Sequence, residues 1–269
     1  MYNERINCAT AEYPFLIKHT NVKYIPHFHE EPEVVYVIAG ELTFTLGLSS
    51  YRIAEGDICI IPSKFIHNLY TDNYSETFVM KLYPSADLSN VYLEHHIVKK
   101  GDSSYDALLK YVSNIIREDQ EKKDHYKLAV NINADNILLY ILRKTKYQTT
   151  DSKVISRRMS DSSFLDRINA FLEERYCEEF SLDDIAGHLN YTKSYFCRYF
   201  KKATGTTFWE YYTMFRLEKS IHYMQDFPKE TLSDIAHKSG FRNVRSFYEA
   251  FHNYHRCTPK EYRKMLQKL

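Results

Sequence analysis

The stretch TLSDIAHKSGFRNVRSFYEAFHNYHRCTPKEYR, residues 231–263, decides the fold of the C-terminal part of the chain. Thr231 predicts a helix start because its hydroxyl can accept a hydrogen bond from a free backbone N–H of the first turn. Gly240 predicts the end of that helix because glycine adopts left-handed dihedral angles at little cost. Asn243 can cap a second helix, on which two phenylalanines four residues apart form one apolar face. Helix, glycine turn and helix together are typical of a helix-turn-helix.

The same pattern occurs about 50 residues earlier, in SLDDIAGHLNYTKSYFCRYFKKATGTT at 181–207. Ile185-Ala186 corresponds to Ile235-Ala236, but the following phenylalanines are offset by one residue more, so the second turn is one residue longer. The second helix of a helix-turn-helix enters the DNA major groove, so the duplication predicts two DNA-reading units. The apolar stripe of Phe208–Met224 predicts a connecting helix of roughly 25 Å, which can hold both units on neighbouring turns of one DNA face.

Positive charge is concentrated on the two predicted reading helices, although the net charge of the chain is only +1. Such a face suits contact with DNA phosphates; a merely solvated helix face is the alternative. Arg198 is the strongest candidate for a bidentate contact with guanine. Lys201 and Lys202 are candidates for phosphate contact. Glu249 could accept a hydrogen bond from cytosine N4 or be solvated. The predicted DNA-contacting set is Thr192 (as a cap), Lys193, Ser194, Cys197, Arg198, Lys201 and Lys202 in the first copy and Asn243 (as a cap or phosphate donor), Arg245, Tyr248 and Glu249 in the second.

At these residues the chain resembles the AraC/XylS family of bacterial transcription regulators, over roughly 163–269. The second copy carries I-A-x-x-S-G-F at 235–241, Ser246 with phenylalanines at 247 and 251, and T-P-x-x-Y-R at 258–263. The first copy carries L-x-D-I-A at 182–186 and S-x-F-x-R-x-F-K-K-x-x-G at 194–205. The family usually has glycine where Arg256 stands, so this helix end must adopt a positive φ without glycine or close differently.

The segment from Pro26 to Leu82 has the pattern of short β-strands. Its apolar residues alternate at 42, 44 and 46 and again at 78, 80 and 82, the period of half-buried strands. Turn residues at Gly40 and at Glu55-Gly56-Asp57 separate these runs. Short strands with frequent turns predict a small barrel or jelly roll.

This segment resembles a cupin. The cupin patterns are met by His27, His29, Glu33 and Gly40 and by Gly56, Pro62 and His67, with Lys64 in place of the second glycine of the second pattern. In metal cupins the three histidines and the glutamate bind a divalent ion, which suits these donor types. Regulators with such a domain often keep these positions as a ligand pocket. We therefore expect a small-molecule effector to contact His27, His29, Glu33, Tyr36 and His67, with Tyr24, Phe44 and Tyr70 nearby. A metal held by His27, His29, Glu33 and His67 remains the alternative, and no cofactor is expected.

Residues 101–146 change to helical spacing, with apolar residues at 105, 108, 109, 112, 115 and 116 and again from 128 to 142. In the resembled family such helices commonly form the dimer, whereas packing within the chain alone is the alternative. Residues 147–162 are polar and without period, which predicts an interdomain linker. The expected fold is therefore α+β and multidomain. A cupin-like barrel or jelly roll at 1–100 and two helices at 101–146 precede an all-α DNA-binding domain at 163–269 with two helix-turn-helix motifs joined by a long helix.

The expected function is that of a ligand-responsive, sequence-specific regulator of a metabolic operon, an activator rather than an enzyme, sensing a molecule such as a sugar. Its expected partners are double-stranded promoter DNA, the effector, RNA polymerase and a second copy of the chain. Five scattered cysteines and the absence of a signal peptide or a membrane-length apolar run favour the cytoplasm and no membrane contact. Two alternatives stay open: a metal cupin enzyme fused to a DNA-binding module, and a constitutive regulator whose barrel only dimerises.

Overall fold

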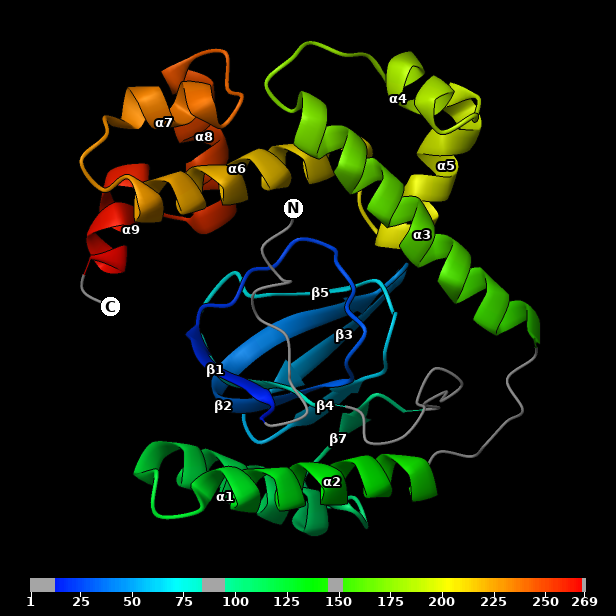
Figure 1. Ribbon diagram of the computed structural model, residues 1–269, viewed down its shortest axis with the longest axis vertical. Coiled ribbons are helices and arrows are strands. Elements are labelled where there is room, and N and C mark those ends of the chain that lie inside the picture. The colour runs from blue at the N-terminus through cyan, green and yellow to red at the C-terminus, as the bar shows by residue number, and fades with distance from the viewer. Residues whose placement is uncertain (1–12, 84–94, 145–151, 268–269) are drawn as a thin grey trace. The chain divides into compact units, whose positions relative to one another are not determined.

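The structure, a computed structural model, describes residues 13–83, 95–144 and 152–267. The chain divides into two compact units, Tyr2–Phe164 and Leu165–Leu269. The first contains antiparallel strands followed by two helices, and the second is helical (Figure 1). This order confirms the predicted succession of a β domain and an all-α domain.

The strands of the first unit form antiparallel pairs around one long strand, β2 (Glu33–Leu46). The first half of β2 lies in a sheet of order β1-β6-β2-β4-β7, and its second half pairs with β3 and β5. The other strands are β1 (Phe15–Thr20), β3 (Ser49–Ala54), β4 (Ile58–Ile61), β5 (His67–Tyr70), β6 (Ser75–Lys81) and β7 (Ile97–Val98).

A β-bulge in β2 changes which of its side chains face the interior between the two sheets. The pairing of β2 with β6 shifts register between Val37 and Ala39, which inserts one extra residue into β2. Val37 before the bulge and Phe44 after it therefore both belong to the interior core, although one number is odd and the other even. Gly40 follows the bulge with φ +75°, and a Cβ there would lie 2.1 Å from the Tyr74 carbonyl oxygen. Only glycine fits this position.

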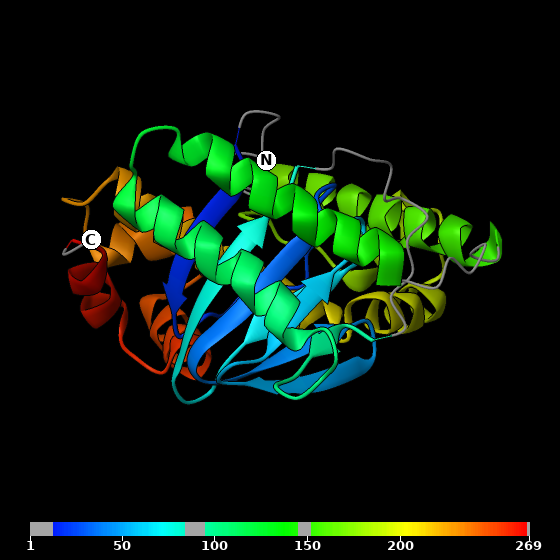
Figure 2. The same cartoon turned by 90° about the horizontal axis from the view of Figure 1, so that it is seen from below.

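The helices α1 (Tyr105–Glu121) and α2 (Tyr126–Lys144) cover the outer face of the larger sheet (Figures 1 and 2). Their buried residues, such as Val112 and Ile137, share one core with Val34, Ile60 and Met80 of the sheet. The sheet is therefore apolar on both faces, which explains why β4 reads as an uninterrupted run of buried residues.

The second unit begins within α3 (Ser152–Arg175). The predicted linker at 147–162 was wrong as a description of residues 152–162, because α3 already covers them; residues 147–151 lie outside the described part of the chain. A polar sequence without an apolar stripe can still form a helix, and this one contains no glycine or proline to interrupt it. The later helices are α4 (Leu182–His188), α5 (Lys193–Thr204), α6 (Phe208–Asp226), α7 (Leu232–Lys238), α8 (Val244–His255) and α9 (Pro259–Leu266).

The duplicated pattern folds as two helix-turn-helix units, α4-α5 and α7-α8, with the long helix α6 between them in sequence (Figure 1). Helix α6 packs against α5 and against α7, α8 and α9. All four phenylalanines at the matching positions, 196, 200, 247 and 251, are fully buried. Among the helices that the structure describes, none combines the length and the apolar composition needed to cross a bilayer.

Candidate nucleic-acid interface and effector site

The first reading helix, α5, begins at a side-chain cap. Thr192 has an extended backbone, and its hydroxyl oxygen accepts a hydrogen bond from the Tyr195 backbone N–H at 3.4 Å. The turn that leads into the helix contains Asn190 with φ 61°, a left-handed conformation that asparagine tolerates better than most residues. The predicted role of Thr192 as a cap is confirmed.

The outer face of α5 carries most of the residues predicted to contact DNA. Ser194, Arg198, Lys201 and Lys202 are exposed, whereas Cys197 is half-buried. The Arg198 Nε group donates to the carbonyl oxygen of Ser194 at 3.3 Å, one turn earlier in the same helix. Among the described residues no acidic side chain forms a salt bridge with Arg198 or Lys202, whereas Lys201 interacts electrostatically with Glu210. Arg198 and Lys202 therefore remain available to a polyanion.

Lys193 differs from the other basic residues of α5. Its ammonium group lies 3.1 Å from the Asp183 carboxylate, and both side chains are exposed. Such a surface ion pair contributes little to stability and is weakened by salt. It nevertheless holds the Lys193 charge beside α4 rather than directing it outward.

The sequence analysis missed a tyrosine cluster on the same helix. Tyr195 is 46% exposed, and its ring centroid lies 4.9 Å from that of Tyr191 and 5.7 Å from that of Tyr199. The spacing of four residues between successive tyrosines was the available signal, since residues i and i+4 are neighbours on a helix surface. The cluster places aromatic surface beside the exposed Arg198.

The second reading helix, α8, is positioned by equivalent devices. Asn243 caps it by accepting the Ser246 backbone N–H at 2.8 Å. Gly240, in the preceding turn, has φ +84°, and a Cβ there would lie 2.3 Å from the Tyr176 carbonyl oxygen. Arg256 ends the helix with φ 57° and ψ 18°. The chain thus adopts the left-handed helix end without glycine, one of the two outcomes expected at this position.

The polar face of α8 is partly neutralised within the helix. Arg245 is highly exposed, and its Nε group donates to the Glu249 carboxylate at 2.9 Å, one turn later. Tyr248 is half-buried against the aromatic core of the second unit rather than fully exposed. A further basic side chain before the helix, Arg242, lies 2.7 Å from the Glu179 carboxylate.

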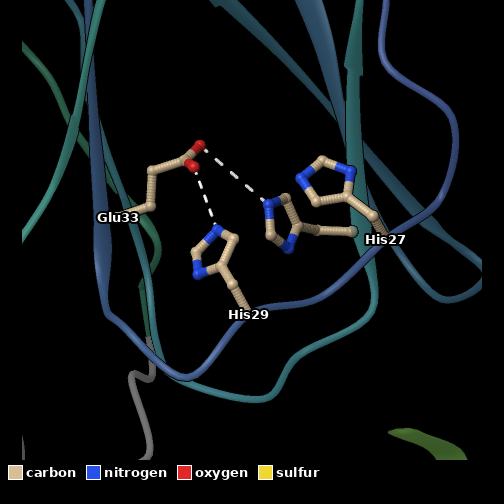
Figure 3. A group of neighbouring side chains, drawn as sticks. His27, His29 and Glu33 are labelled. Carbon is tan, nitrogen blue, oxygen red and sulfur yellow. Dashed lines mark hydrogen bonds and ion pairs between the residues drawn. The ribbon is translucent and has the colours of Figure 1, made fainter. Parts of the chain in front are cut away.

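In the first unit, the backbone brings two of the predicted effector-site histidines together. His27 and His67 form an isolated antiparallel bridge, in which each backbone N–H donates to the carbonyl oxygen of the other residue, at 2.9 and 2.8 Å. Their rings consequently lie close, with centroids 4.4 Å apart. His29 follows on the same segment, and Glu33 is the first residue of β2 (Figure 3).

The donor atoms of His27, His29, Glu33 and His67 all lie within 4.8 Å of one another. His29 Nε2 lies 3.0 Å from one carboxylate oxygen of Glu33 (Figure 3). His67 Nε2 lies 3.9 Å from the other carboxylate oxygen. All four residues are buried. The structure thus assembles four of the five predicted effector-site residues into one cluster, here called the histidine cluster.

Each histidine of the cluster is oriented by a backbone carbonyl. The Nδ1 atoms of His27, His29 and His67 lie 2.8, 2.6 and 2.8 Å from the carbonyl oxygens of Ile25, Glu31 and Phe65. A carbonyl oxygen can only accept, so each Nδ1 carries the proton and donates it. For His27 and His67 this leaves Nε2 as the basic nitrogen, the arrangement that prepares an imidazole to act as a ligand, whereas Nε2 of His29 donates to the Glu33 carboxylate.

The cluster is polar but incompletely satisfied. The Glu33 Oε1 and His67 Nε2 atoms are buried and have no hydrogen-bond partner among the described residues. Leaving such an atom unpaired costs about 1–3 kcal/mol, more for a charged group.

Burial controls the charge states in the cluster. It lowers the pKa of His27 to about 3, with His29 adding to the effect, and lowers the pKa of His67 to about 3, with His27 adding to it. Burial alone raises the pKa of Glu33, but the hydrogen bond from His29 and the nearby imidazoles outweigh it and hold that pKa at about 2. At neutral pH the cluster therefore presents the neutral imidazoles of His27 and His67 beside the Glu33 carboxylate.

The structure does not bring Tyr36 together with the other predicted effector-site residues. Tyr36 lies on the opposite side of β2 from Glu33 and packs against the core shared with α1 and α2. Tyr70 also alternates away from the buried His67 and Leu69 on β5. In an uninterrupted apolar run such as the start of β2, the sequence does not show which side chains face the interior of the sheet domain and which face α1 and α2.

Two other buried polar groups near the cluster were missed. Lys81 pairs directly with Glu33 across β2 and β6, so both side chains lie on the same face, and Lys81 is buried. His96 is also buried, and its ring centroid lies 6.0 Å from that of Phe44, which in turn lies 6.5 Å from that of His67. The alternation of Phe78 and Met80 on β6 could have placed Lys81 on the inner face.

The chain is similar to characterised protein families over both units. Residues 11–138 match an AraC-like ligand binding domain, and residues 185–265 match a helix-turn-helix domain. The chain is 23% identical to the uncharacterized HTH-type transcriptional regulator YdeC of Bacillus subtilis, over 95% of this chain and 94% of that protein. It is 24% identical to the HTH-type transcriptional activator RhaS of Shigella boydii, over 88% of this chain and 87% of that protein.

A solved structure shares the fold. The unsaturated fatty acid bound wild-type ToxT from Vibrio cholerae matches with a TM-score of 0.53 and 17% identity, over 94% of this chain and 96% of that one. The sequence relatives are transcriptional regulators rather than enzymes. Together with the two capped helix-turn-helix units and the sheet domain that precedes them, these matches show that the chain belongs to the AraC family of ligand-responsive, DNA-binding transcriptional regulators.

Proposed function

We propose that residues 163–269 bind double-stranded promoter DNA and place α5 and α8 in consecutive segments of the major groove. The observation that carries this proposal is the pair of capped helix-turn-helix units, each with an exposed arginine on its second helix. Helix α6, which packs against both units, has 19 residues and spans about 28 Å. One turn of B-DNA is about 34 Å, so a connector of this length suits neighbouring turns.

The two reading helices have unequal roles in this proposal. Arg198 reads a guanine, because its fork of donors matches the guanine O6 and N7 acceptors and no acidic partner competes for it. Lys201 and Lys202, near the end of α5, contact phosphate. Arg245 shares its donors with Glu249, so α8 contributes less to affinity than α5 does.

A second copy of the chain docks on α2. Leu128, Ile132 and Leu139 are exposed apolar residues on this helix. Together with Asp135 they follow the alternating spacing of four and three residues that defines a coiled-coil seam. An Asp135 within the seam favours a specific register over indiscriminate association. The homodimer then presents two copies of the DNA-binding domain, residues 163–269 of each chain, to one promoter.

The sheet domain senses the effector in the region of the histidine cluster. Its interior contains buried imidazoles, a carboxylate and the ammonium group of Lys81. Such a site favours a polar or charged ligand, of which a sugar is one kind, over a purely apolar one. The effector acts by binding one arrangement of the two units more tightly than another, which changes the affinity for DNA.

The proposed output is activation of a metabolic operon in the cytoplasm through contact with RNA polymerase. The name of the relative RhaS, a transcriptional activator, supports this direction of control.

Fluorescence anisotropy with the DNA upstream of the gene and of its neighbours tests the proposal. Arg198→Ala should weaken specific binding by about 1–3 kcal/mol and leave binding to unrelated duplexes nearly unchanged. Lys264→Ala is the control and should have little effect. It removes an exposed cation from α9, which lies outside both helix-turn-helix motifs. Equal affinities of the wild type and Arg198→Ala for every duplex would contradict the assignment of Arg198.

A further inference from the structure

We propose that the histidine cluster binds one divalent first-row transition-metal ion through the Nε2 atoms of His27, His29 and His67 and the carboxylate of Glu33. This inference deepens the proposed function, since it names the class of ligand held at the sensing site. It can be tested without DNA, so the metal site and the regulatory role can fail separately.

The distances between the donor atoms of the histidine cluster fit coordination of one ion better than they fit hydrogen bonds among the four side chains. Tetrahedral coordination at about 2.0–2.1 Å places neighbouring donor atoms about 3.4 Å apart. The two measured separations from Glu33, 3.0 Å to His29 and 3.9 Å to His67, lie on either side of that value. The four donor atoms all lie within 4.8 Å of one another, so only small side-chain movements are needed to bring them to coordination distances.

The donor set selects the kind of ion. Imidazole nitrogen is a good ligand for zinc, iron, nickel and copper, whereas calcium and magnesium prefer sites made of oxygen. Three neutral imidazoles alone are sufficient to hold a divalent ion, as in catalytic zinc sites with three histidines. The ammonium group of Lys81, beside Glu33, therefore does not prevent binding.

The surroundings are arranged to keep the ligands in place. The carbonyls of residues 25, 31 and 65 accept the Nδ1 protons, which leaves Nε2 of His27 and His67 as the basic atom. At His29 the metal ion would replace the proton that Nε2 donates to Glu33, since metal binding releases protons from its ligands. Outer hydrogen bonds of this kind orient metal-bound histidines in general. The reciprocal backbone hydrogen bonds between His27 and His67 fix the two rings at one end of the sheet domain.

The two unpaired atoms provide an independent observation. Glu33 Oε1 and His67 Nε2 are buried and have no hydrogen-bond partner in the part of the chain that the structure describes, and both belong to the proposed ligand set. An ion between them would satisfy both at once. A single water molecule is the competing occupant, and the measurement below separates the two.

The test uses the full chain purified without a polyhistidine tag. After chelation and dialysis, the protein is loaded separately with Zn²⁺, Mn²⁺, Fe²⁺, Co²⁺ and Ni²⁺, and bound metal is measured by plasma mass spectrometry. We expect about one ion per chain with at least one of these metals, and a visible Co²⁺ absorption spectrum that reports nitrogen and oxygen ligands. Less than one-tenth of an equivalent with every metal, the result expected for a water-filled cluster, would overturn the proposal.

Variants locate the ion. Glu33→Gln and His67→Gln should each reduce metal affinity at least roughly tenfold and alter the Co²⁺ spectrum. His96→Gln removes another buried imidazole of the same domain, separated from His67 by Phe44, and should retain the wild-type stoichiometry and spectrum. Circular dichroism checks folding, and His29→Gln replaces any variant that does not fold. Unchanged metal binding in both ligand variants would place the ion elsewhere. Metal binding that persists in a protein without specific DNA binding would refute the proposed function and leave the metal site standing.

Discussion

Arg245 and Glu249 form an ion pair on the exposed face of α8, with the arginine Nε atom 2.9 Å from the carboxylate. The position of α5 that matches Glu249 holds Arg198, which has no acidic residue one turn later, because Lys202 occupies that position. The two reading helices therefore have the same fold but different electrostatics. The unpaired arginine favours contact with DNA, and the paired one has to exchange a carboxylate for a base or phosphate.

Replacing Glu249 should release Arg245 for DNA. Glu249→Gln is expected to raise affinity for all duplexes and to steepen the salt dependence by about one unit, because one more cation becomes available to phosphate. Adding Arg245→Ala to this variant should remove the gain. Anisotropy titrations at several salt concentrations measure both effects. A loss of affinity confined to the specific site would instead show that Glu249 reads a base.

Thr192 should contribute to stability as a cap. Thr192→Ala is expected to lower the free energy of unfolding of the second unit by about 0.5–2 kcal/mol, because the Tyr195 N–H loses its acceptor. Thr192→Ser keeps the hydroxyl and should restore most of the loss. Urea unfolding followed by circular dichroism provides the comparison. Equal stability of the alanine and serine variants would show that the cap contributes nothing.

Two glycines should respond in opposite ways to alanine. Gly240→Ala introduces a Cβ 2.3 Å from the Tyr176 carbonyl oxygen at a positive φ, and should destabilise by more than about 1 kcal/mol. Gly187→Ala lies within α4 with nothing within 4 Å of the added Cβ, and should stabilise by about 0.5–1 kcal/mol. Thermal unfolding of both variants tests the pair. A Gly240→Ala protein as stable as the wild type would contradict the close backbone approach.

The seam on α2 makes a prediction about oligomeric state. Ile132→Asp places a charge on the exposed apolar stripe and should weaken self-association at least tenfold, about 1.4 kcal/mol. Lys127→Glu changes an exposed residue of α2 outside the seam and should leave the association unchanged. Sedimentation velocity over a range of protein concentrations distinguishes the two variants. A wild type that remains monomeric at all concentrations would exclude the α2 interface.

Local signals in the sequence predicted the second unit in detail. Caps such as Thr192 and Asn243 act within one helical turn, so the residues that form them are adjacent in the sequence. The histidine cluster was also predictable, since the spacing of His27, His29 and Glu33 and the later His67 resembled a known pattern. Its assembly depends on strand pairing, which the turns at Gly40 and Gly56 helped to indicate.

Other features depended on packing that the sequence does not report. The side of β2 on which Tyr36 lies depends on α1 and α2, which make both faces of the sheet apolar. The start of α3 at Ser152 could not be found from apolar periodicity, because its first turns contain mainly polar residues. The pairing of Arg245 with Glu249 was available from their spacing of four residues but was not inferred.

The central claim is that α5 and α8 bind consecutive segments of the major groove of one duplex. Selection of DNA from a random duplex library tests this claim most directly. Wild-type protein should enrich sequences with two preferred blocks separated by about one helical turn, and Arg198→Ala should relax the preference in one block only. Enrichment of a single block, or two blocks that are both unaffected by Arg198→Ala, would contradict the account.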